Sequence, residues 1–158
     1  MNNLLLVVLL IFITFASSTP MRRQDTHLKQ CEGTFPNEIT SYGFKPYPII
    51  VGQLVTNHVT GKVTVPVEEG ATVKHSIYYN NQLRLEHTED FCSFIVIPSG
   101  HTCPVTSQNF DYTVNIMAKS TPNDPKNVVL DFFTRTLITN PDGRNLTCIE
   151  QYVKYSFP

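Results

Sequence analysis

Apolar and polar residues alternate over short stretches along most of the chain, and turn residues separate these stretches. In residues 110–116, Phe, Tyr, Val and Ile alternate with Asp, Thr and Asn. A period of two places successive side chains on opposite faces of a strand. Similar patterns occupy residues 71–79 and 146–157, and an Asn-Pro-Asp-Gly turn signal stands at residues 140–143. The pattern predicts strands and short turns, with no long amphipathic helix.

We expect about seven strands between residues 38 and 157, with turns at Gly61, at residues 68–70 and at residues 80–82. Residues 91–104 are irregular but rich in apolar side chains. Strands joined by short turns are typical of two antiparallel sheets packed face to face. The fold class is therefore all-β, with the architecture of a sandwich.

The first thirty residues predict a targeting segment. Residues 4–15 form an apolar run, and small residues follow at Ala16 and Ser18. This is typical of a signal peptide, and the run is shorter than the roughly 20 residues of a membrane span. We expect a signal peptide over residues 1–18, a disordered or short pro-segment over 19–30 and one domain over 31–158. A signal anchor is the alternative.

Composition narrows the function classes. The formal net charge is −1 and no basic stripe is present, which argues against nucleic-acid binding. The domain left after the signal peptide is long enough to bury its own core, so we expect a monomer. The chain would be secreted, or reside in a vacuolar or lysosomal lumen, by way of the secretory pathway.

Four cysteines follow the signal segment: Cys31, Cys92, Cys103 and Cys148. An even number in a secretory chain predicts disulfides. Zinc ligation is disfavoured because no C-x-x-C pair and no histidine at zinc spacing accompany them. Three pairings are possible, and the spacing alone does not choose among them. We expect no metal and no cofactor.

Several short motifs follow one another in a recognisable order. They are Cys31, Pro46-x-Pro48 with Gly52-Gln53, Gly61, Glu69-Gly70-Ala71, Asp90-x-Cys92, Cys103-Pro104 and Leu146-Thr147-Cys148-Ile149-Glu150. Together they resemble the ML lipid-recognition domain family, especially its phosphatidylglycerol/phosphatidylinositol transfer protein-like branch of fungi and plants. The third disulfide of the animal sterol carriers is absent. The Pro-x-Gly-x-Tyr signature of the family is replaced at residues 123–127.

The resemblance implies an immunoglobulin-like β-sandwich with a hydrophobic lipid cavity between its sheets. It also implies the disulfides Cys31–Cys148 and Cys92–Cys103, and a protein that is not an enzyme. The cargo would be a phospholipid or a sterol, exchanged during transient membrane contact. The alternative is a secreted interaction module, such as a receptor co-factor or effector, whose core is filled.

Inward apolar positions are the candidates for the cavity lining, although strand periodicity alone fits a filled core equally well. The candidates are Val55, Val73, Ile77, Tyr79, Leu83, Leu85, Phe110, Tyr112, Val114, Leu130, Phe132, Val153 and Tyr155. Three apolar residues of the irregular stretch, Phe94, Ile95 and Ile97, are candidates for the cavity entrance. Their alternative is a loop folded back onto the core.

Candidate chemistry adds little. The five histidines show no H-E-x-x-H spacing, and no G-x-S-x-G context surrounds a serine, so no catalytic residue is assigned. His87 or His101 near the entrance would be able to tune release in an acidic compartment. Asn145 begins an Asn-Leu-Thr sequon and is a candidate glycosylation site.

Overall fold

The computed structural model describes residues 28–158, and the expected signal peptide lies outside the described residues. Seven strands of eight or more residues occur in this part of the chain, together with two strands of two residues. The strands are β1 (Lys29–Gln30), β2 (Glu38–Lys45), β3 (Ile49–Ile50), β4 (Leu54–Lys62), β5 (Thr72–Tyr79), β6 (Gln82–Asp90), β7 (Asn109–Met117), β8 (Val128–Thr139) and β9 (Asn145–Phe157).

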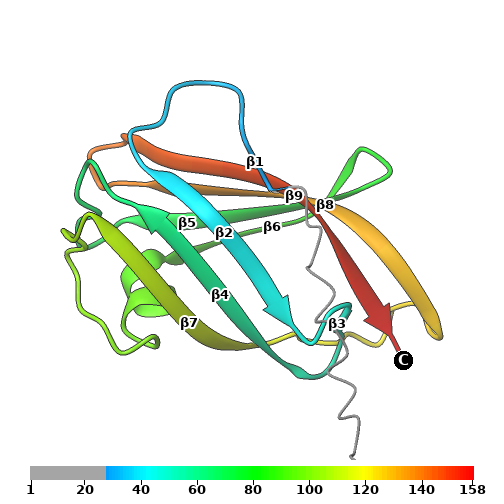
Figure 1. Cartoon of the computed structure of the whole chain (residues 1–158). Helices are drawn as coiled ribbons and strands as arrows, with labels where there is room; N and C mark the ends of the chain where they lie inside the picture. Colours follow the sequence, from blue (N-terminus) through cyan, green and yellow to red (C-terminus); the bar gives the residue numbers. More distant parts are fainter. Residues whose placement is uncertain (1–27) are drawn as a thin grey trace, which may run out of the picture.

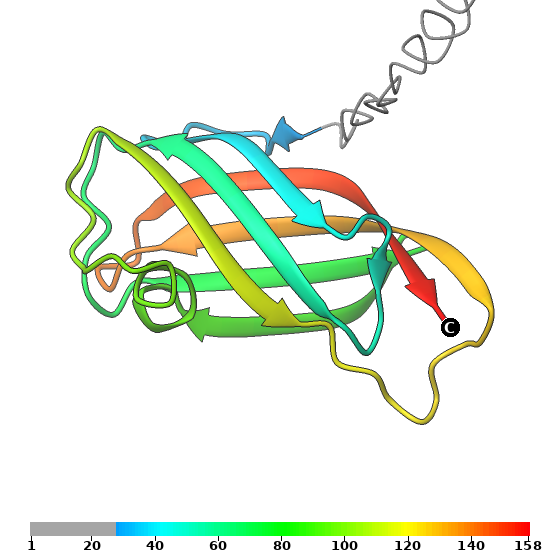
Figure 2. The ribbon, with the colours of Figure 1, turned by 60° about the horizontal axis from the view of Figure 1, so that its bottom comes forward.

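The strands form two sheets that face each other (Figures 1 and 2). The larger sheet has the order β1-β9-β8-β5-β6, with β3 also paired to β9, and the smaller has the order β2-β4-β7. Every pair of long strands is antiparallel, whereas the short β3 runs parallel to β9. The all-β sandwich expected from the alternation of residues is confirmed. Within residues 28–158, no helix combines the length and apolar character that a membrane span needs.

The alternating residues of β7 face as their chemistry predicts. Tyr112 and Val114 are buried, whereas Asp111 and Thr113 between them are exposed. Antiparallel pairing places Tyr112 directly opposite Val59 of β4. The inward residues of β7 and Val59 therefore form an apolar surface at this end of the smaller sheet, which packing against the larger sheet removes from water.

The β5–β6 hairpin follows from two adjacent asparagines. Asn80 and Asn81 have φ angles of +51° and +62°, the left-handed conformation that a two-residue type I′ turn needs at both central positions. Asparagine tolerates that conformation better than most residues. Tyr79 consequently pairs with Gln82, so β6 begins one residue earlier than the expected turn allowed.

Gly61 does not turn the chain, contrary to expectation. It lies within β4, opposite Ile39 of β2 and Phe110 of β7. A Cβ at this position would collide with the Glu38 carbonyl oxygen and the Phe110 ring. The glycine therefore serves close packing of backbone and ring inside a sheet, which a sequence pattern does not distinguish from a turn.

One end of the sandwich is closed by a packed core. Val73, Val96 and Leu146 are each at most 2 % exposed there. The irregular stretch contributes η1 (Cys92–Val96), a single turn of π-helix, and folds back so that Ile95 is also buried. The apolar residues of this stretch thus seal one end of the molecule.

Both disulfides have the pairing that the family resemblance implies. Cys31 and Cys148 have Cα atoms 5.4 Å apart, and those of Cys92 and Cys103 are 6.0 Å apart. The first bond fastens the start of the domain to β9, and the neighbouring residues Lys29–Gln30 consequently pair with that strand as β1. β1 therefore belongs to the larger sheet, and the expected domain boundary at residue 31 stays a prediction.

Candidate functional site

A cavity of about 480 Å³ lies between the two sheets. Its walls come from β2, β4 and β7 on one side and from β5, β6, β8 and β9 on the other. A small-molecule pocket typically occupies about 300–1,000 Å³, so the space accommodates an organic ligand. The interior is therefore filled at one end and hollow at the other.

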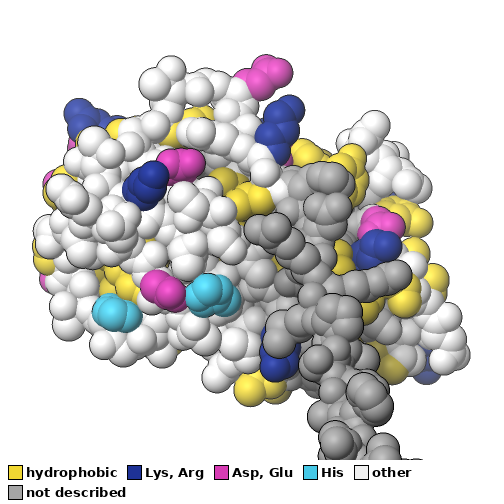
Figure 3. Space-filling model, viewed as in Figure 1, with side chains coloured by type: hydrophobic (Ala, Val, Ile, Leu, Met, Phe, Trp, Pro, Cys, Tyr) yellow, Lys and Arg dark blue, Asp and Glu magenta, His cyan; other side chains and the backbone are white. Residues whose placement is uncertain are grey.

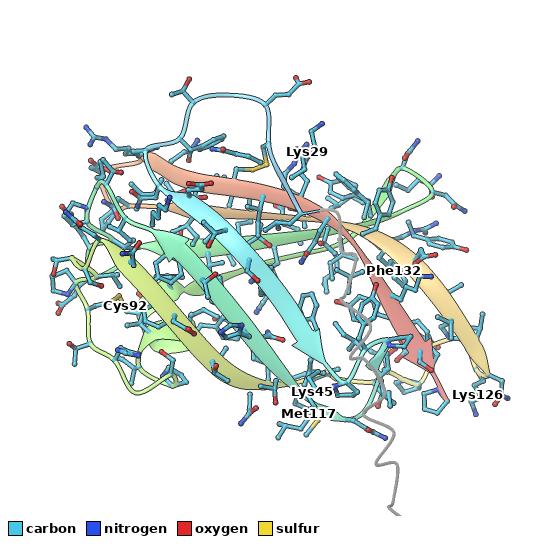
Figure 4. All side chains as sticks on the ribbon, viewed as in Figure 1. Lys29, Lys45, Cys92, Met117, Lys126 and Phe132 are labelled. Atoms are coloured by element: carbon cyan, nitrogen blue, oxygen red, sulfur yellow. A yellow bond between two sulfur atoms is a disulfide. The ribbon has the colours of Figure 1, made fainter. Side chains whose placement is uncertain are left out.

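Six of the predicted lining residues surround this cavity. They are Val55, Ile77, Leu85, Phe132, Val153 and Tyr155. Val55 and Val153 come from opposite sheets and belong to one apolar cluster with Ile49 of β3. Phe132 projects from β8 in the cavity half of the molecule (Figure 4). These side chains provide a largely apolar wall.

Four predicted lining residues lie in the closed core instead. Val73, Tyr112 and Val114 are buried in that core, and Phe110 packs against it. The rings of Phe110 and Tyr112 stack with centroids 5.1 Å apart. Their inward orientation was predicted, but this end of the interior is filled, so their side chains contact other side chains.

Three further candidates lie outside the cavity, at or near the ends of their strands. Tyr79 and Leu83 flank the β5–β6 hairpin, which projects away from the smaller sheet (Figure 1). Leu83 is 51 % exposed, and the Tyr79 ring packs against the ring of the lining residue Phe132, with centroids 5.4 Å apart. Leu130 pairs with Tyr155 without reaching the cavity. All three residues belong to strands of the larger sheet.

The entrance residues separate into three environments. Phe94 lines the cavity, Ile95 is buried in the closed core at 6 % exposure, and Ile97 is 59 % exposed away from the cavity. A helical turn explains the separation, because its side chains point in different directions around the axis. The expectation that all three residues stand together at an entrance is not met.

The lining residues that reach solvent mark a different opening. Leu85 of β6 is 54 % exposed and Met117 of β7 is 51 % exposed, and both line the cavity. β6 and β7 are edge strands of their respective sheets. Met117 lies far from Cys92 and the closed end of the molecule (Figure 4). We call Leu85, Met117 and the adjacent exposed Leu54, which pairs with Met117, the rim.

A tied loop borders the rim between β7 and β8. Thr121 donates hydrogen bonds to Asp124 from its backbone N–H and from its hydroxyl, each 2.7 Å long. These bonds lower the pKa of Asp124, which also lines the cavity. Figure 2 shows this loop at the same end as the C-terminus. The loop occupies the region where the family signature is missing.

Besides tyrosines, charged residues and the exposed His87, five polar residues line the cavity, and we call them the polar belt: Asn57, His75, Thr134, Thr136 and Gln151. They come from β4, β5, β8 and β9. The Thr134 hydroxyl donates a hydrogen bond to the backbone carbonyl oxygen of Gln151 at 3.1 Å. His75 Nδ1 lies 3.0 Å from the Thr136 hydroxyl. The sequence analysis missed this belt because single polar residues on an inward face carry no periodic signal.

His75 and the tyrosines that line the cavity are uncharged at neutral pH. Burial and, to a smaller extent, the nearby His87 together lower the pKa of His75 to about 4. Burial raises the pKa of Tyr155 to about 12, and that of Tyr42 also rises through burial and its interaction with Tyr155. Of the charged lining residues, Arg84 and Lys119 are exposed, whereas Glu89 and Asp124 are half-buried. Desolvation therefore favours a neutral, apolar occupant.

The two histidines expected near the entrance lie in different places. His87 lines the cavity, and its Nε2 is 2.6 Å from a carboxylate oxygen of Glu89. His101 packs against the ring of Tyr112 in the closed half, with centroids 4.8 Å apart. His87 alone of this pair is placed to contact a ligand.

Other chemistry is sparse on the described part of the chain. Residues 28–158 contain no group of three or more histidine, cysteine, aspartate or glutamate side chains arranged to hold a metal ion. Basic and acidic side chains are interspersed over the face shown in Figure 3. Asn145 is exposed at the start of β9, where its side-chain oxygen accepts a hydrogen bond from Thr139. Its glycosylation stays a prediction.

Comparisons with known proteins agree with this geometry. A family model described as the ML domain matches residues 25–155. The crystal structure of a Niemann-Pick type C2 protein from the Japanese carpenter ant is similar with a TM-score of 0.63 and 15 % identity, covering 82 % of this chain and 98 % of that one. Chicken MD-1 complexed with lipid IVa is less similar, with a TM-score of 0.44 and 13 % identity over 80 % and 86 % of the chains. A search of curated protein sequences gave no match. At such identities the structural likeness shows the fold alone.

Proposed function

The chain belongs to the ML domain family, and we propose that it binds one lipid in the cavity between its sheets and transfers it between membranes. The observation that supports this proposal best is the cavity of about 480 Å³ with its largely apolar wall. The proposed cargo is a phospholipid or a sterol, and the proposed setting is the secretory pathway or the space outside the cell. The ordered sequence motifs support the phosphatidylglycerol/phosphatidylinositol transfer branch as a further hypothesis.

The energetics of such a cavity permit both loading and release. Burying one CH₂ group is worth about 0.8 kcal/mol, so a sixteen-carbon chain gains on the order of 12 kcal/mol on leaving water. A bilayer offers the chain nearly the same gain. Exchange between cavity and bilayer is therefore close to balanced, and no coupled reaction is needed to drive it.

The rim supports a site of membrane contact. Leu54 and Met117 are adjacent across the β4–β7 pair and each is more than half exposed. Exposed neighbouring apolar side chains are a feature of surfaces that meet a partner or a membrane. Because Met117 also lines the cavity, a lipid leaving at this point would pass from the cavity into the bilayer without crossing water.

Blocking the cavity tests the proposed function. Ile116 lines the cavity from β7, so Ile116→Trp places a larger side chain in the space that the lipid needs. Val129 is 53 % exposed on the outside of β8, and Val129→Trp is the matched control. We expect the affinity for a fluorescent acyl-chain probe to fall at least tenfold, or about 1.4 kcal/mol, in Ile116→Trp alone. Equal probe affinity in both variants and the wild type would refute binding in this cavity.

A further inference from the structure

A row of apolar side chains crosses the outer face of the larger sheet. Its members stand in direct register on the neighbouring strands β6, β5, β8 and β9 (Figure 1), and we call them the outer row: Leu83, Tyr78, Phe133 and Tyr152. Successive side chains of a strand point to opposite faces, and the adjacent residues Ile77 and Phe132 line the cavity. The outer row therefore lies on the side of the sheet that faces away from the cavity.

The outer row is held in place but remains partly open to solvent. The centroid of the Phe133 ring lies 5.9 Å from that of Tyr78 and 5.4 Å from that of Tyr152. The ring planes are tilted by 53° and 60° to one another, so the row is corrugated rather than flat. Tyr152 is 59 % exposed and Leu83 is 51 % exposed. Cross-strand contacts thus order the rings, and their exposed parts are available to a ligand.

Polar side chains border the outer row on both sides. On one side a second row stands in direct register on the same four strands, and its members are Glu86, Ser76, Arg135 and Glu150. Arg135 Nε donates a hydrogen bond to a Glu150 carboxylate oxygen at 2.9 Å, and Lys74 Nζ lies 3.7 Å from a Glu86 carboxylate oxygen. On the other side Asp131 stands opposite Lys154. The borders therefore carry charges of both signs without an excess of either.

The narrowness of the outer row limits what it can bind. The row is one side chain wide, so a bilayer that covered it would also desolvate the charged borders. Its four half-exposed side chains offer roughly 400 Å² of apolar surface, whereas each partner of a stable protein interface buries about 800 Å². A long, narrow and uncharged ligand therefore fits the row better than a membrane or a protein surface does.

We propose that the outer row binds an extended chain of neutral, β-linked sugars. A pyranose ring has apolar C–H faces that stack on aromatic rings, and it carries hydroxyl groups around its edge. The distances between the ring centroids are similar to the length of one sugar unit, so successive units meet Tyr152, Phe133 and Tyr78 in turn. Rotation about the glycosidic bonds lets the chain follow the tilted rings. The sugar hydroxyls reach the borders, where Arg135 donates hydrogen bonds and the Asp131 carboxylate accepts them.

This site is separate from the lipid cavity, because the two use opposite faces of the larger sheet. Binding at the outer row holds the chain on a polysaccharide and leaves the cavity and the rim accessible. The inference therefore goes beyond the proposed function and does not depend on it.

Affinity gel electrophoresis of the mature chain tests this inference. Native gels contain hydroxyethylcellulose, xyloglucan or laminarin, which are soluble and neutral β-glucans, and gels with the α-linked glucan dextran are the polymer control. Tyr152→Ala removes the exposed ring at one end of the outer row, whereas Tyr152→Phe keeps the ring. Ile97→Ala is the matched control, because it removes an apolar side chain that is likewise 59 % exposed but lies outside the row.

We expect at least one β-glucan, and not dextran, to retard the wild type, Tyr152→Phe and Ile97→Ala to the same extent. Its dissociation constant should rise about tenfold in Tyr152→Ala, as the loss of one stacked ring predicts. An unchanged melting temperature shows that this variant is folded, and an unchanged affinity for the acyl-chain probe separates the outer row from the cavity. If Tyr152→Ala fails to fold, Leu83→Ala at the other end of the row decides the outcome.

The inference is overturned if no β-glucan retards the wild type, or if the folded alanine variant is retarded as strongly as the wild type. In a wild type that no β-glucan retards, Tyr152-dependent binding to phosphatidylcholine vesicles would assign the row to a membrane. A Tyr152-dependent dimer, detected by light scattering, would assign it to a second copy of the chain. Each of these results leaves the proposed lipid cavity standing.

Discussion

His75 shows how burial controls charge at the level of a single residue. Its ring lies between sheets, hydrogen-bonded to Thr136 and in edge contact with Phe94. His87 is its cross-strand neighbour. Burial, and then the second histidine, lower its pKa from 6.5 to about 4. The ring is therefore neutral throughout the pH range of the secretory pathway, and the belt stays uncharged.

This shift predicts a pH dependence of stability. In the unfolded chain His75 becomes protonated as the pH falls below 6.5, whereas in the folded chain it becomes protonated only near pH 4. Stability is therefore lost as the pH falls through this window, by about 2 kcal/mol between pH 7 and pH 5. Urea unfolding at both pH values should show a loss smaller by that amount in His75→Gln. A loss of the same size in variant and wild type would rule out this role for His75.

Single polar residues on an inward face are also features that could not be predicted from the sequence. Asn57 and Gln151 each occur once within an apolar face, and neither lies in a motif. Their significance depends on which side chains stand opposite them on the other sheet, and that is a property of tertiary packing. Alternation within a strand predicts the inward face, as it did for Val55 and Val153. It does not predict which inward positions remain without a partner.

At the scale of elements, strand periodicity predicted the sheets well, but not where along them the sheets separate. Val73 and Ile77 occupy the same face of β5, yet the first is packed in the closed core and the second lines the cavity. The difference arises from η1 and the Cys92–Cys103 loop, which fill only one end. The local sequence of a strand does not encode which part of the space between the sheets is filled by another segment.

The edge strands give a prediction at this scale. Met117 is an exposed lining residue of β7, whereas Ile97 is an exposed residue just beyond η1. If the rim contacts the bilayer, Met117→Asp should slow transfer of a fluorescent lipid to vesicles several-fold, because an inserted carboxylate must be desolvated. Ile97→Asp, which adds the same charge at the closed end, should leave the rate near that of the wild type.

The melting temperature of each variant serves as the control, since both substitutions affect exposed side chains and should leave it nearly unchanged. Slower transfer by Ile97→Asp with normal transfer by Met117→Asp would place the contact at the closed end. That result would restore the entrance expected from the sequence and contradict the assignment of the rim.

At the scale of the whole molecule, the two ends have different tasks. The closed end holds the apolar core that includes Val96 and Leu146, with a disulfide beside it. We expect that the open end can remain hollow, with a largely apolar wall, because the packed end supplies a stable frame for the sandwich.

The central claim is that this hollow half carries a lipid, and extraction after loading tests it most directly. The mature chain is incubated with mixed phospholipid and sterol vesicles, separated from them, and analysed by mass spectrometry of the organic extract. We predict close to one lipid per chain for the wild type and a marked loss in Ile116→Trp. An extract from the wild type with no more lipid than that of the cavity-blocked variant would contradict the account.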